Sequence, residues 1–525
     1  MRHSFQALSP ARFLARSAAV YGDRTAVIDG EFRVTYAELY HRAKQLAGAL
    51  VDLDLRAGGR VAVLATNRNE MLEAHYGVPF AGGVIVPINT RLGAAEIAYI
   101  LNHSGADIVI TSESLADLAA AAVARSRQVI TVVRTGEGYE RALAQATPYE
   151  AVVSDELGPI AINYTSGTTG SPKGVVYTHR GVYLQSLAIA FHAGLMAESS
   201  YLWTLPMFHC NGWCFTWAVT AAAATHVCLD KVDRRVVWSA IEDHGVTHMC
   251  AAPTVLSTLV PPDEAGEIGD RSIWVGVGGA PPAPAVLARA YARGLHVTHL
   301  YGMTETYGPV VINQWKPEWD QRPAEERDRL SARQGVGNIV SERVRVVDPA
   351  GADVPADGAT IGEIALRGNN ITPRYFNDPA ATEAAVPDGW LRTGDLAVRH
   401  PDGYLEIRDR AKDVIISGGE NLTSVEIEQA LLSHPAVIEA AVVARPDEHW
   451  GERPVAFIET AAGTQVSETE LREHLLARIA RFKVPDAFEF GTLPRTATGK
   501  IQKFVLKQRL RAAFATDEPD RVDTR

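Results

Sequence analysis

The sequence predicts an α/β fold in two units. A large N-terminal domain combines parallel-rich α/β sheets with a small β-barrel, and a small C-terminal domain is α+β. Strand-like and helical segments alternate through the first part, helix-poor strands follow near residue 340, and a compact mixed pattern begins after Arg410. From these three observations we expect an N-terminal domain over residues 1–409 and a C-terminal domain over residues 410–525.

Short β-branched runs mark the strands of the first part. They alternate with helical patterns over residues 36–51, 234–244 and 283–293. Because such alternation is typical of parallel strands joined by crossover helices, we expect parallel sheets with helices on their faces. The expected strands span residues 60–65, 84–89, 107–111, 129–133, 159–165, 225–230, 247–252, 272–277 and 296–301.

The segment after residue 340 has few helical patterns. Its strand-like runs cover residues 343–348, 361–367 and 404–408, with turn residues between them, as at Pro349-Ala350-Gly351. Short strands linked by turns favour a small antiparallel barrel or meander.

Two capping boxes organise the last part. Thr423-x-x-Glu426 predicts the start of a helix over 424–433, and Ser467-x-x-Glu470 predicts the start of one over 468–479. Strands are expected at residues 413–417, 437–443 and 454–459, and an amphipathic closing helix at 501–515.

Composition and charge exclude several classes of protein. Hydrophobic residues make up 46% and charged residues 22%, which is ordinary for a globular protein and excludes a disordered chain. The net charge of −11 provides no overall basic surface, so we expect no nucleic-acid partner. No apolar run approaches the ~20 residues of a membrane span, so we expect no integral membrane contact.

The cysteines and the N-terminus bear on the compartment. The four cysteines (Cys210, Cys214, Cys228 and Cys250) lie in apolar surroundings without a zinc-ribbon spacing, which favours buried free thiols and a reducing compartment. The first residues lack the apolar core of a signal peptide, so we expect a cytoplasmic protein.

A glycine- and hydroxyl-rich loop, Tyr164-Thr-Ser-Gly-Thr-Thr-Gly-Ser-Pro-Lys-Gly174, lies between two apolar strands. Its glycines let backbone N–H groups turn towards an anion, its hydroxyls add donors, and Lys173 adds a positive charge. The Walker pattern is absent. The loop therefore predicts a polyphosphate site of another kind.

This loop resembles the signature loop of the adenylate-forming enzymes, which include acyl-CoA synthetases. The similarity continues in order through the chain and covers nearly all of it. Five further segments resemble family motifs: Gly278-Gly-Ala-Pro281, Tyr301-Gly-Met-Thr-Glu-Thr306, Trp390-Leu-Arg-Thr-Gly-Asp395, Arg408-Asp-Arg-Ala-Lys-Asp413 and Pro494-Arg-Thr-Ala-Thr-Gly-Lys500. Within the family, the chain is most similar to medium-chain and methylmercaptopropionate-type acyl-CoA synthetases.

The resemblance implies two half-reactions. A carboxylate attacks the α-phosphorus of ATP to give acyl-AMP and pyrophosphate, and the CoA thiol then takes the acyl group and releases AMP. It implies catalytic roles for Lys500, Glu305, Thr304 and His209, with Glu305 as the ligand of Mg²⁺. The implied ATP/AMP contacts are Thr165, Ser166, Gly167, Thr168, Thr169, Gly170, Lys173, Gly279, Ala280, Pro281, Tyr301, Asp395 and Arg410.

Residue types refine several of these roles. Asp395 suits the ribose hydroxyls because a carboxylate accepts two hydrogen bonds, and Tyr301 is expected to stack on adenine. Lys500 stands at the start of a predicted helix, where the macrodipole disfavours a cation, and such conflicts tend to mark functional positions. Lys503 is expected to be a solvated helix charge.

The motifs say less about the acyl group of the substrate than about the nucleotide. By the family pattern the pocket is lined by Cys210, Trp213, Gly278, Gly302 and Val310. The two glycines are expected to leave open volume and Trp213 to limit it, which favours a medium-length or bulky apolar acid over acetate. His209 stands where amino-acid-activating relatives place an aspartate, which argues against an amino acid substrate.

The resemblance also implies that the C-terminal domain is mobile. Lys412 matches the hinge about which this domain swings between the two steps, and the swing brings Gly418 and Gly419 to the site, where glycines let a pantetheine arm pass close to the backbone.

Alternatives remain open at the sequence level. The thiol can belong to CoA or to an acyl carrier protein, and the motifs do not identify the acid. Related enzymes are often homodimers, but no interface is apparent here. A kinase-like phosphotransferase would release ADP, and a non-catalytic nucleotide-binding protein would not need both Lys500 and Glu305.

Overall fold

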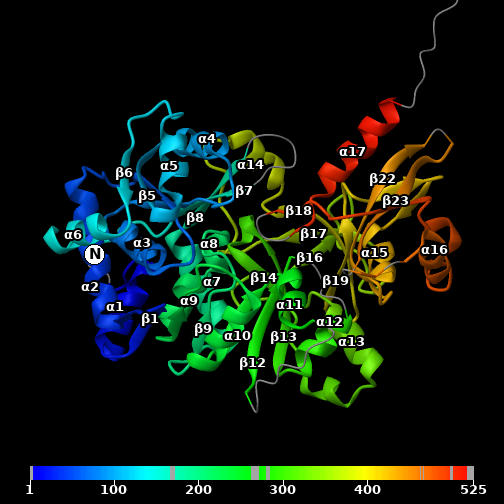
Figure 1. Ribbon diagram of the computed structural model, residues 1–525, viewed down its shortest axis with the longest axis horizontal. Coiled ribbons are helices and arrows are strands. Elements are labelled where there is room, and N and C mark those ends of the chain that lie inside the picture. The colour runs from blue at the N-terminus through cyan, green and yellow to red at the C-terminus, as the bar shows by residue number, and fades with distance from the viewer. Residues whose placement is uncertain are drawn as a thin grey trace, which may run out of the picture.

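The computed structural model describes residues 4–165, 172–261, 271–279, 284–447, 449–460, 463–464, 466–496 and 500–516. The N-terminal part of the chain fills one side of the molecule, and the C-terminal sheet with its helices lies on the other side (Figure 1). Between these two parts stand β18 (Leu391–Arg399) and β19 (Leu405–Arg410), which lead into the C-terminal part.

The first sheet has six strands, parallel except for its last pair, as expected from the strand–helix alternation. Alternate residues of β3 face opposite sides: Val61 and Val63 pack towards one group of helices, and Ala62 and Leu64 towards another. The strand order is β6 (Thr131–Arg134), β5 (Ala106–Thr111), β3 (Arg60–Leu64), β4 (Val84–Pro87), β7 (Pro159–Thr165) and β8 (Lys173–Thr178). Helices α2 (Tyr36–Asp52) and α3 (Asn69–Phe80) cover one face, and α4 (Ala94–Ser104) and α5 (Ala116–Val123) cover the other.

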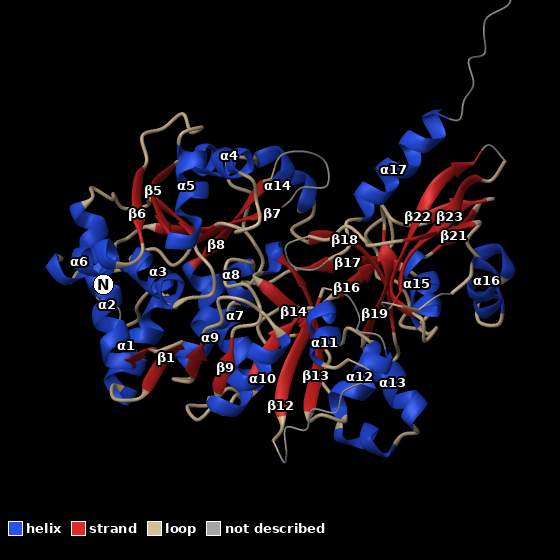
Figure 2. Ribbon diagram, viewed as in Figure 1, coloured by secondary structure: helices blue, strands red, loops and turns tan. Residues whose placement is uncertain are grey.

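The second sheet has nine strands, parallel in the centre and antiparallel at both edges. In order they are β15 (Val336–Gly337), β14 (Gly308–Ile312), β13 (Leu295–Met303), β12 (Ile273–Gly278), β11 (His248–Ala251), β9 (Ser200–Leu202), β10 (Thr225–Val227), β1 (Thr25–Asp29) and β2 (Phe32–Thr35). Figure 2 shows the sheet's long strands β12, β13 and β14 running side by side in the lower centre of the view. One face packs against α10 (Arg234–Asp243), α11 (Pro253–Leu259) and α12 (Pro284–Tyr291).

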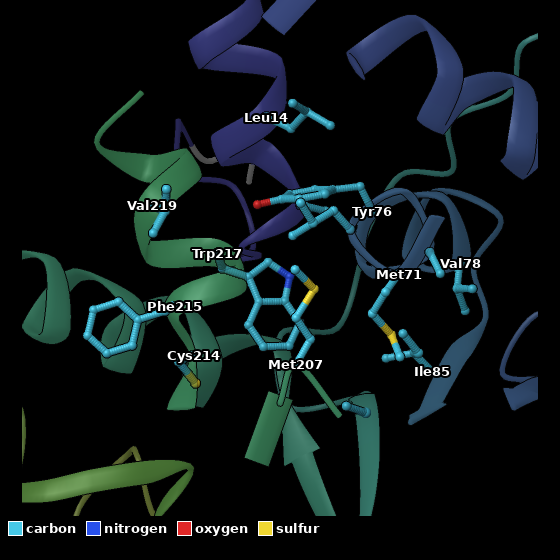
Figure 3. Close-up of a cluster of buried hydrophobic side chains, with 14 of the residues drawn as sticks. Leu14, Met71, Tyr76, Val78, Ile85, Met207, Cys214, Phe215, Trp217 and Val219 are labelled. Atoms are coloured by element: carbon cyan, nitrogen blue, oxygen red, sulfur yellow. The ribbon is translucent and has the colours of Figure 1, made fainter. Parts of the chain in front are cut away.

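A continuous apolar core joins the two sheets. It includes residues of α1 (Ala11–Tyr21), α7 (His179–Ala193) and α9 (Phe215–Ala221) together with α3. Figure 3 shows Trp217 of α9 in this core, close to Met207 and Tyr76. These side chains are fully buried, so many of the aromatic residues near residue 210 belong to the core.

A four-stranded antiparallel meander stands where the sequence predicts the small barrel: β16 (Arg345–Val347), β17 (Gly362–Leu366), β18 and β19. The C-terminal sheet follows, with β21 (Glu420–Leu422), β20 (Ile415–Ser417), β23 (Gly451–Thr460) and β22 (Val437–Asp447) in order, and β24 (Ala487–Phe490) beside β23. Helices α15 (Ser424–Leu432) and α16 (Glu468–Leu476) pack on one face and α17 (Lys503–Thr516) on the other.

The capping boxes form less completely than predicted. Thr423 makes no side-chain hydrogen bond to its helix backbone: its hydroxyl donates to Glu426 Oε2 at 3.4 Å, and the Glu426 carboxylate also lies 2.7 Å from Lys483. Ser467 does accept from the Glu470 N–H, at 3.2 Å. All four cysteines are buried free thiols, as predicted. Among the helices within the described ranges, none is long and apolar enough to cross a membrane.

Candidate active site

The site begins where β12 and β13 end together. These parallel neighbours pair Gly278 with Leu300, so their carboxyl ends lie at one edge of the sheet. After β13 the chain makes a 3-10 turn over Thr304–Thr306 and returns as β14. Open α/β sheets bind ligands at this edge, which here carries Gly279, Tyr301, Thr304 and Glu305.

Glu305 is tied to the end of the phosphate loop through Tyr375. The Tyr375 hydroxyl donates to Glu305 Oε1 at 2.7 Å, and Lys173 Nζ lies 5.1 Å from the centre of the same tyrosine ring. Burial raises the pKa of Tyr375, and the Glu305 charge raises it further, so the phenol stays a donor. Sequence reasoning missed Tyr375, since it stands in an irregular segment without a periodic pattern.

Asp395 links the meander to β13. Its Oδ2 accepts from the Tyr301 hydroxyl at 2.7 Å, and its Oδ1 lies 2.9 Å from Arg410 Nε. Asp395 and Arg410 are directly paired residues of β18 and β19, which explains why both face the site. The structure therefore brings together three residues that were predicted to contact the nucleoside.

Lys500 reaches this cluster from the C-terminal part of the chain. Its Cε lies 3.0 Å from where a Cβ atom on Gly279 would stand, and Gly279 has a φ of +100°. Lys500 is exposed overall, and its ammonium lies within electrostatic range of Glu305, Asp395 and Arg410. Desolvation lowers the pKa of Lys500, Arg410 lowers it further, and the acidic groups oppose this. Helix α17 begins at Lys503, so Lys500 precedes the helix instead of starting it as predicted.

His209 and Cys210 line the site beside Thr304. Cys210 Sγ lies 3.4 Å from Thr304 Oγ1. Burial lowers the pKa of His209 to about 3, with nearby Lys500 acting in the same direction, so the ring is neutral. Burial also raises the pKa of Cys210 to about 11, so it is a thiol and not a nucleophilic thiolate.

The acyl-pocket residues are packed more closely than expected. A Cβ atom on Gly278 would lie 2.8 Å from the Trp213 ring, and one on Gly302 would lie 2.0 Å from the Gly308 carbonyl oxygen. The expectation that the two glycines leave open volume is therefore wrong, because an indole ring and a backbone fill it. Val310 is fully buried in the core formed with the meander, and its place in the pocket stays a prediction.

The segment predicted to be the hinge, around Lys412, is held by α17. Lys507 Nζ donates to the Lys412 carbonyl oxygen at 2.8 Å and pairs with Asp413 at the same distance. Lys503 is not a solvated charge as predicted: it forms an ion pair with Glu428 at 2.7 Å in a largely buried setting. Both lysines stand one helical turn apart, which lets α17 hold the hinge and α15 at once.

Gly418 and Gly419 form the turn between β20 and β21, with φ values of +60° and +85°. A Cβ atom on Gly418 would lie 2.7 Å from the half-exposed ring of Trp450. The turn therefore needs glycine for its conformation and, at Gly418, for its space.

Part of the predicted site lies outside the described residues: Ser166, Gly167, Thr168, Thr169, Gly170, Ala280 and Pro281. The ends of the phosphate loop are described. Thr165 ends β7, Lys173 begins β8, and the two are paired, so the loop connects an antiparallel pair of strands.

Family comparisons agree with this arrangement. Residues 14–376 match the model of the AMP-binding enzyme family, and residues 426–500 match that of the AMP-binding enzyme C-terminal domain. An acetate–CoA ligase from Humulus lupulus is 45% identical over 96% of this chain and 95% of its own, and a 2-methylpropanoate–CoA ligase from the same plant is 42% identical over the same shares. The structure of an o-succinylbenzoate CoA synthetase from Bacillus subtilis, in complex with its acyl-adenylate intermediate, covers 98% of this chain and 99% of its own, with a TM-score of 0.82 and 29% identity.

The match to one family model over more than half of the chain, and to CoA ligases over almost all of it, agrees with the motif order and with the placement of Lys500 at the sheet edge. The chain belongs to the AMP-binding enzyme family of adenylate-forming acyl-CoA synthetases and is an acid–thiol ligase.

Proposed function

We propose that the protein activates a short carboxylic acid with ATP and transfers the acyl group to the thiol of CoA. The observation that carries the proposal is the position of Lys500, which a separate sheet and helix bring against Gly279 and close to Glu305. A cation there stabilises the negative charge that develops when a carboxylate attacks the α-phosphorus.

The remaining nucleotide contacts that we propose are compatible with the same geometry. Thr304 lies beside Glu305 and contacts the α-phosphate, Lys173 and the loop after Thr165 hold the outer phosphates, and Asp395 takes the ribose. Tyr301 supports the ribose through Asp395 and presents its ring to adenine.

The donor chemistry at Glu305 fits Mg²⁺. A buried carboxylate, oriented by the Tyr375 hydroxyl, is a hard oxygen donor of the kind that Mg²⁺ uses together with phosphates and water. Bound with the nucleotide, the ion neutralises phosphate charge. The protein's own part is to hold the Glu305 oxygens in place.

The second step needs the C-terminal domain to move, and we place its boundary at Arg410. We place the Gly418–Gly419 turn outside the site while Lys500 is in it, and propose that rotation about Lys412 exchanges one for the other. Trp450 over Gly418 gives that turn an apolar surface suited to a pantetheine arm. Free CoA is the proposed acceptor, and an acyl carrier protein is the alternative.

The packing around Trp213 supports a short acid. Lys500 touches Gly279, and the preceding residue, Gly278, which ends β12, is covered by the Trp213 ring. An acyl chain that starts at Lys500 meets the indole after a few carbons. Relatives named for acetate and for 2-methylpropanoate have similar sequences, which supports the same conclusion. A reducing compartment, such as the cytoplasm, suits the four thiols.

The test is a panel of straight-chain acids from acetate to dodecanoate, with and without CoA, and identification of the nucleotide product. We expect AMP and pyrophosphate, acyl-CoA only when CoA is added, and the highest kcat/KM for the shortest acids. Acyl-AMP that free CoA does not consume would favour the carrier protein. ADP as product, or a preference for octanoate over acetate, would contradict the proposal.

A further inference from the structure

The residues that carry Trp213 have an unusual backbone. Five consecutive residues have positive φ: Cys210 (50°), Asn211 (45°), Gly212 (60°), Trp213 (54°) and Cys214 (64°). Together they form one left-handed helical turn. This conformation is unfavourable for residues with a Cβ atom, and of the five only glycine and asparagine adopt it readily. The surrounding structure must therefore hold the turn in place.

A buried polar network holds it through Asn211. Asn163 and Asn211 exchange two hydrogen bonds: the Asn211 N–H donates to Asn163 Oδ1 at 3.2 Å, and Asn163 Nδ2 donates to Asn211 Oδ1 at 2.5 Å. Asn211 Nδ2 donates to His75 Nε2 at 2.9 Å. The Thr216 hydroxyl donates to the Asn211 carbonyl oxygen at 3.0 Å. All four polar groups of Asn211 are engaged, although the residue is fully buried.

The role of His75 in this network is fixed by its other nitrogen. Nδ1 lies 2.6 Å from the Met71 carbonyl oxygen, so it carries the proton and Nε2 is left as the acceptor for Asn211. Burial lowers the pKa of His75 to about 4, which keeps this neutral form across the physiological range. The ring also packs edge-on against Trp217, with 5.1 Å between the ring centroids; Figure 3 shows Trp217 in the core.

The turn sets where the indole of Trp213 lies. A Cβ atom on Gly308 would lie 2.9 Å from the Trp213 Cα, so the backbone of the turn rests directly on the start of β14. From there the ring reaches Gly278. A change in the turn would therefore move the indole away from Gly278 at the end of β12.

We propose that Asn211, Asn163 and His75 are positioning residues for acyl-chain length: they hold the left-handed turn that presses Trp213 onto Gly278 and closes the pocket to acids longer than butyrate. The inference rests on the proposed function, in which the Trp213 ring ends the acyl site. None of the three residues needs to touch the acid, because they act through Trp213.

The readout is the ratio of kcat/KM for hexanoate to that for acetate. Trp213→Ala serves as the reference and should raise this ratio at least about tenfold, since each methylene that a pocket admits is worth about that factor or more. Asn163→Leu and His75→Phe remove hydrogen bonds to Asn211 at similar side-chain volume and should raise it in the same direction. His75→Gln keeps an acceptor and should recover most of the wild-type ratio.

Two further variants separate positioning from general destabilisation. His248→Phe removes another buried histidine, which bonds the Ala193 carbonyl oxygen away from the turn, and should lower the melting temperature without changing the ratio. Adding Asn163→Leu to Trp213→Ala should change the ratio no further, because both act through the same ring. Should a network variant fail to fold, Asn211→Gly replaces it, since glycine tolerates the native φ.

The possible outcomes distinguish a failure of the positioning role from a failure of the proposed pocket or function. The positioning role would be overturned if Trp213→Ala raised the ratio while Asn163→Leu and His75→Phe, both folded and able to bind AMP, kept the wild-type ratio. The proposed pocket would then remain intact. An unchanged ratio in Trp213→Ala would overturn the pocket and the positioning role together. Absence of AMP formation in the wild-type protein would overturn the proposed function itself.

Discussion

Tyr375 offers a sharp test of how the site holds Glu305. Tyr375→Phe removes only the hydroxyl that donates to Glu305 Oε1 at 2.7 Å and keeps the ring beneath Lys173. Both partners are buried and the acceptor is a carboxylate group, so the hydrogen bond is worth about 1.5–3 kcal/mol. If that orientation is needed in the transition state, the rate of adenylation should fall about 10- to 150-fold.

The assay is the initial rate of pyrophosphate release at saturating acid and ATP, measured over a range of Mg²⁺ concentrations. We expect a lower kcat and a higher Mg²⁺ concentration for half-maximal rate in Tyr375→Phe, and a larger loss in Tyr375→Leu, which also removes the ring from Lys173.

Tyr404→Phe is the matched control. Tyr404 is also buried, donates to the Gln314 carbonyl oxygen and has a lysine, Lys316, 5.0 Å from its ring centre, but it lies outside the site. It should leave both quantities unchanged. Wild-type rate and Mg²⁺ dependence in Tyr375→Phe would refute the reasoning, as would an equal loss in Tyr404→Phe.

Three further predictions concern the C-terminal part. Lys500→Ala should abolish pyrophosphate release yet still convert supplied acyl-AMP to acyl-CoA. Because the charged form of Lys500 is the active one and its pKa is lowered, wild-type adenylation should decline as the pH rises through a value below the pKa of an ordinary lysine. A rate that does not change with pH in the alkaline range would contradict this. Lys412→Pro should spare adenylation and impair thioester formation, so equal loss of both steps, measured separately, would count against the hinge. Lys503→Met should destabilise the fold by about 3–5 kcal/mol in urea unfolding, because it leaves Glu428 buried without its partner, and adding Glu428→Leu should restore most of this; an unchanged midpoint in the single variant would show that the pair contributes nothing.

Local sequence signals predicted most of the fold. The runs at Pro159–Thr165 and Arg60–Leu64 are strands because their apolar residues are buried on both faces, which gives a strong signal without tertiary information. Helix α10 is recognisable in the same way, and Asp233 caps it. At Thr423 the helix begins as predicted, but the box is incomplete: the Thr423 hydroxyl bonds the Glu426 carboxylate, which also pairs with Lys483, far along the chain.

The site was predictable where residues form ordered motifs and not where distant side chains meet. Lys500, Glu305 and Asp395 lie in such motifs. Asn211 contacts Asn163 and His75, which are 48 and 136 residues away in the sequence, and no local sequence pattern predicts either contact. The close packing of Trp213 on Gly278 also depends on this turn, and composition alone suggests open space there.

The central claim is that the acid is activated as an acyl-adenylate, and an oxygen label tests it most directly. Acetate carrying ¹⁸O in both carboxylate positions is incubated with the enzyme, ATP and CoA, and the masses of the products are measured by mass spectrometry. Attack on the α-phosphorus leaves one carboxylate oxygen on that phosphorus when the thiol breaks the acyl C–O bond. The account predicts AMP with one ¹⁸O and unlabelled pyrophosphate. Unlabelled AMP, or label in inorganic phosphate together with ADP, would contradict it.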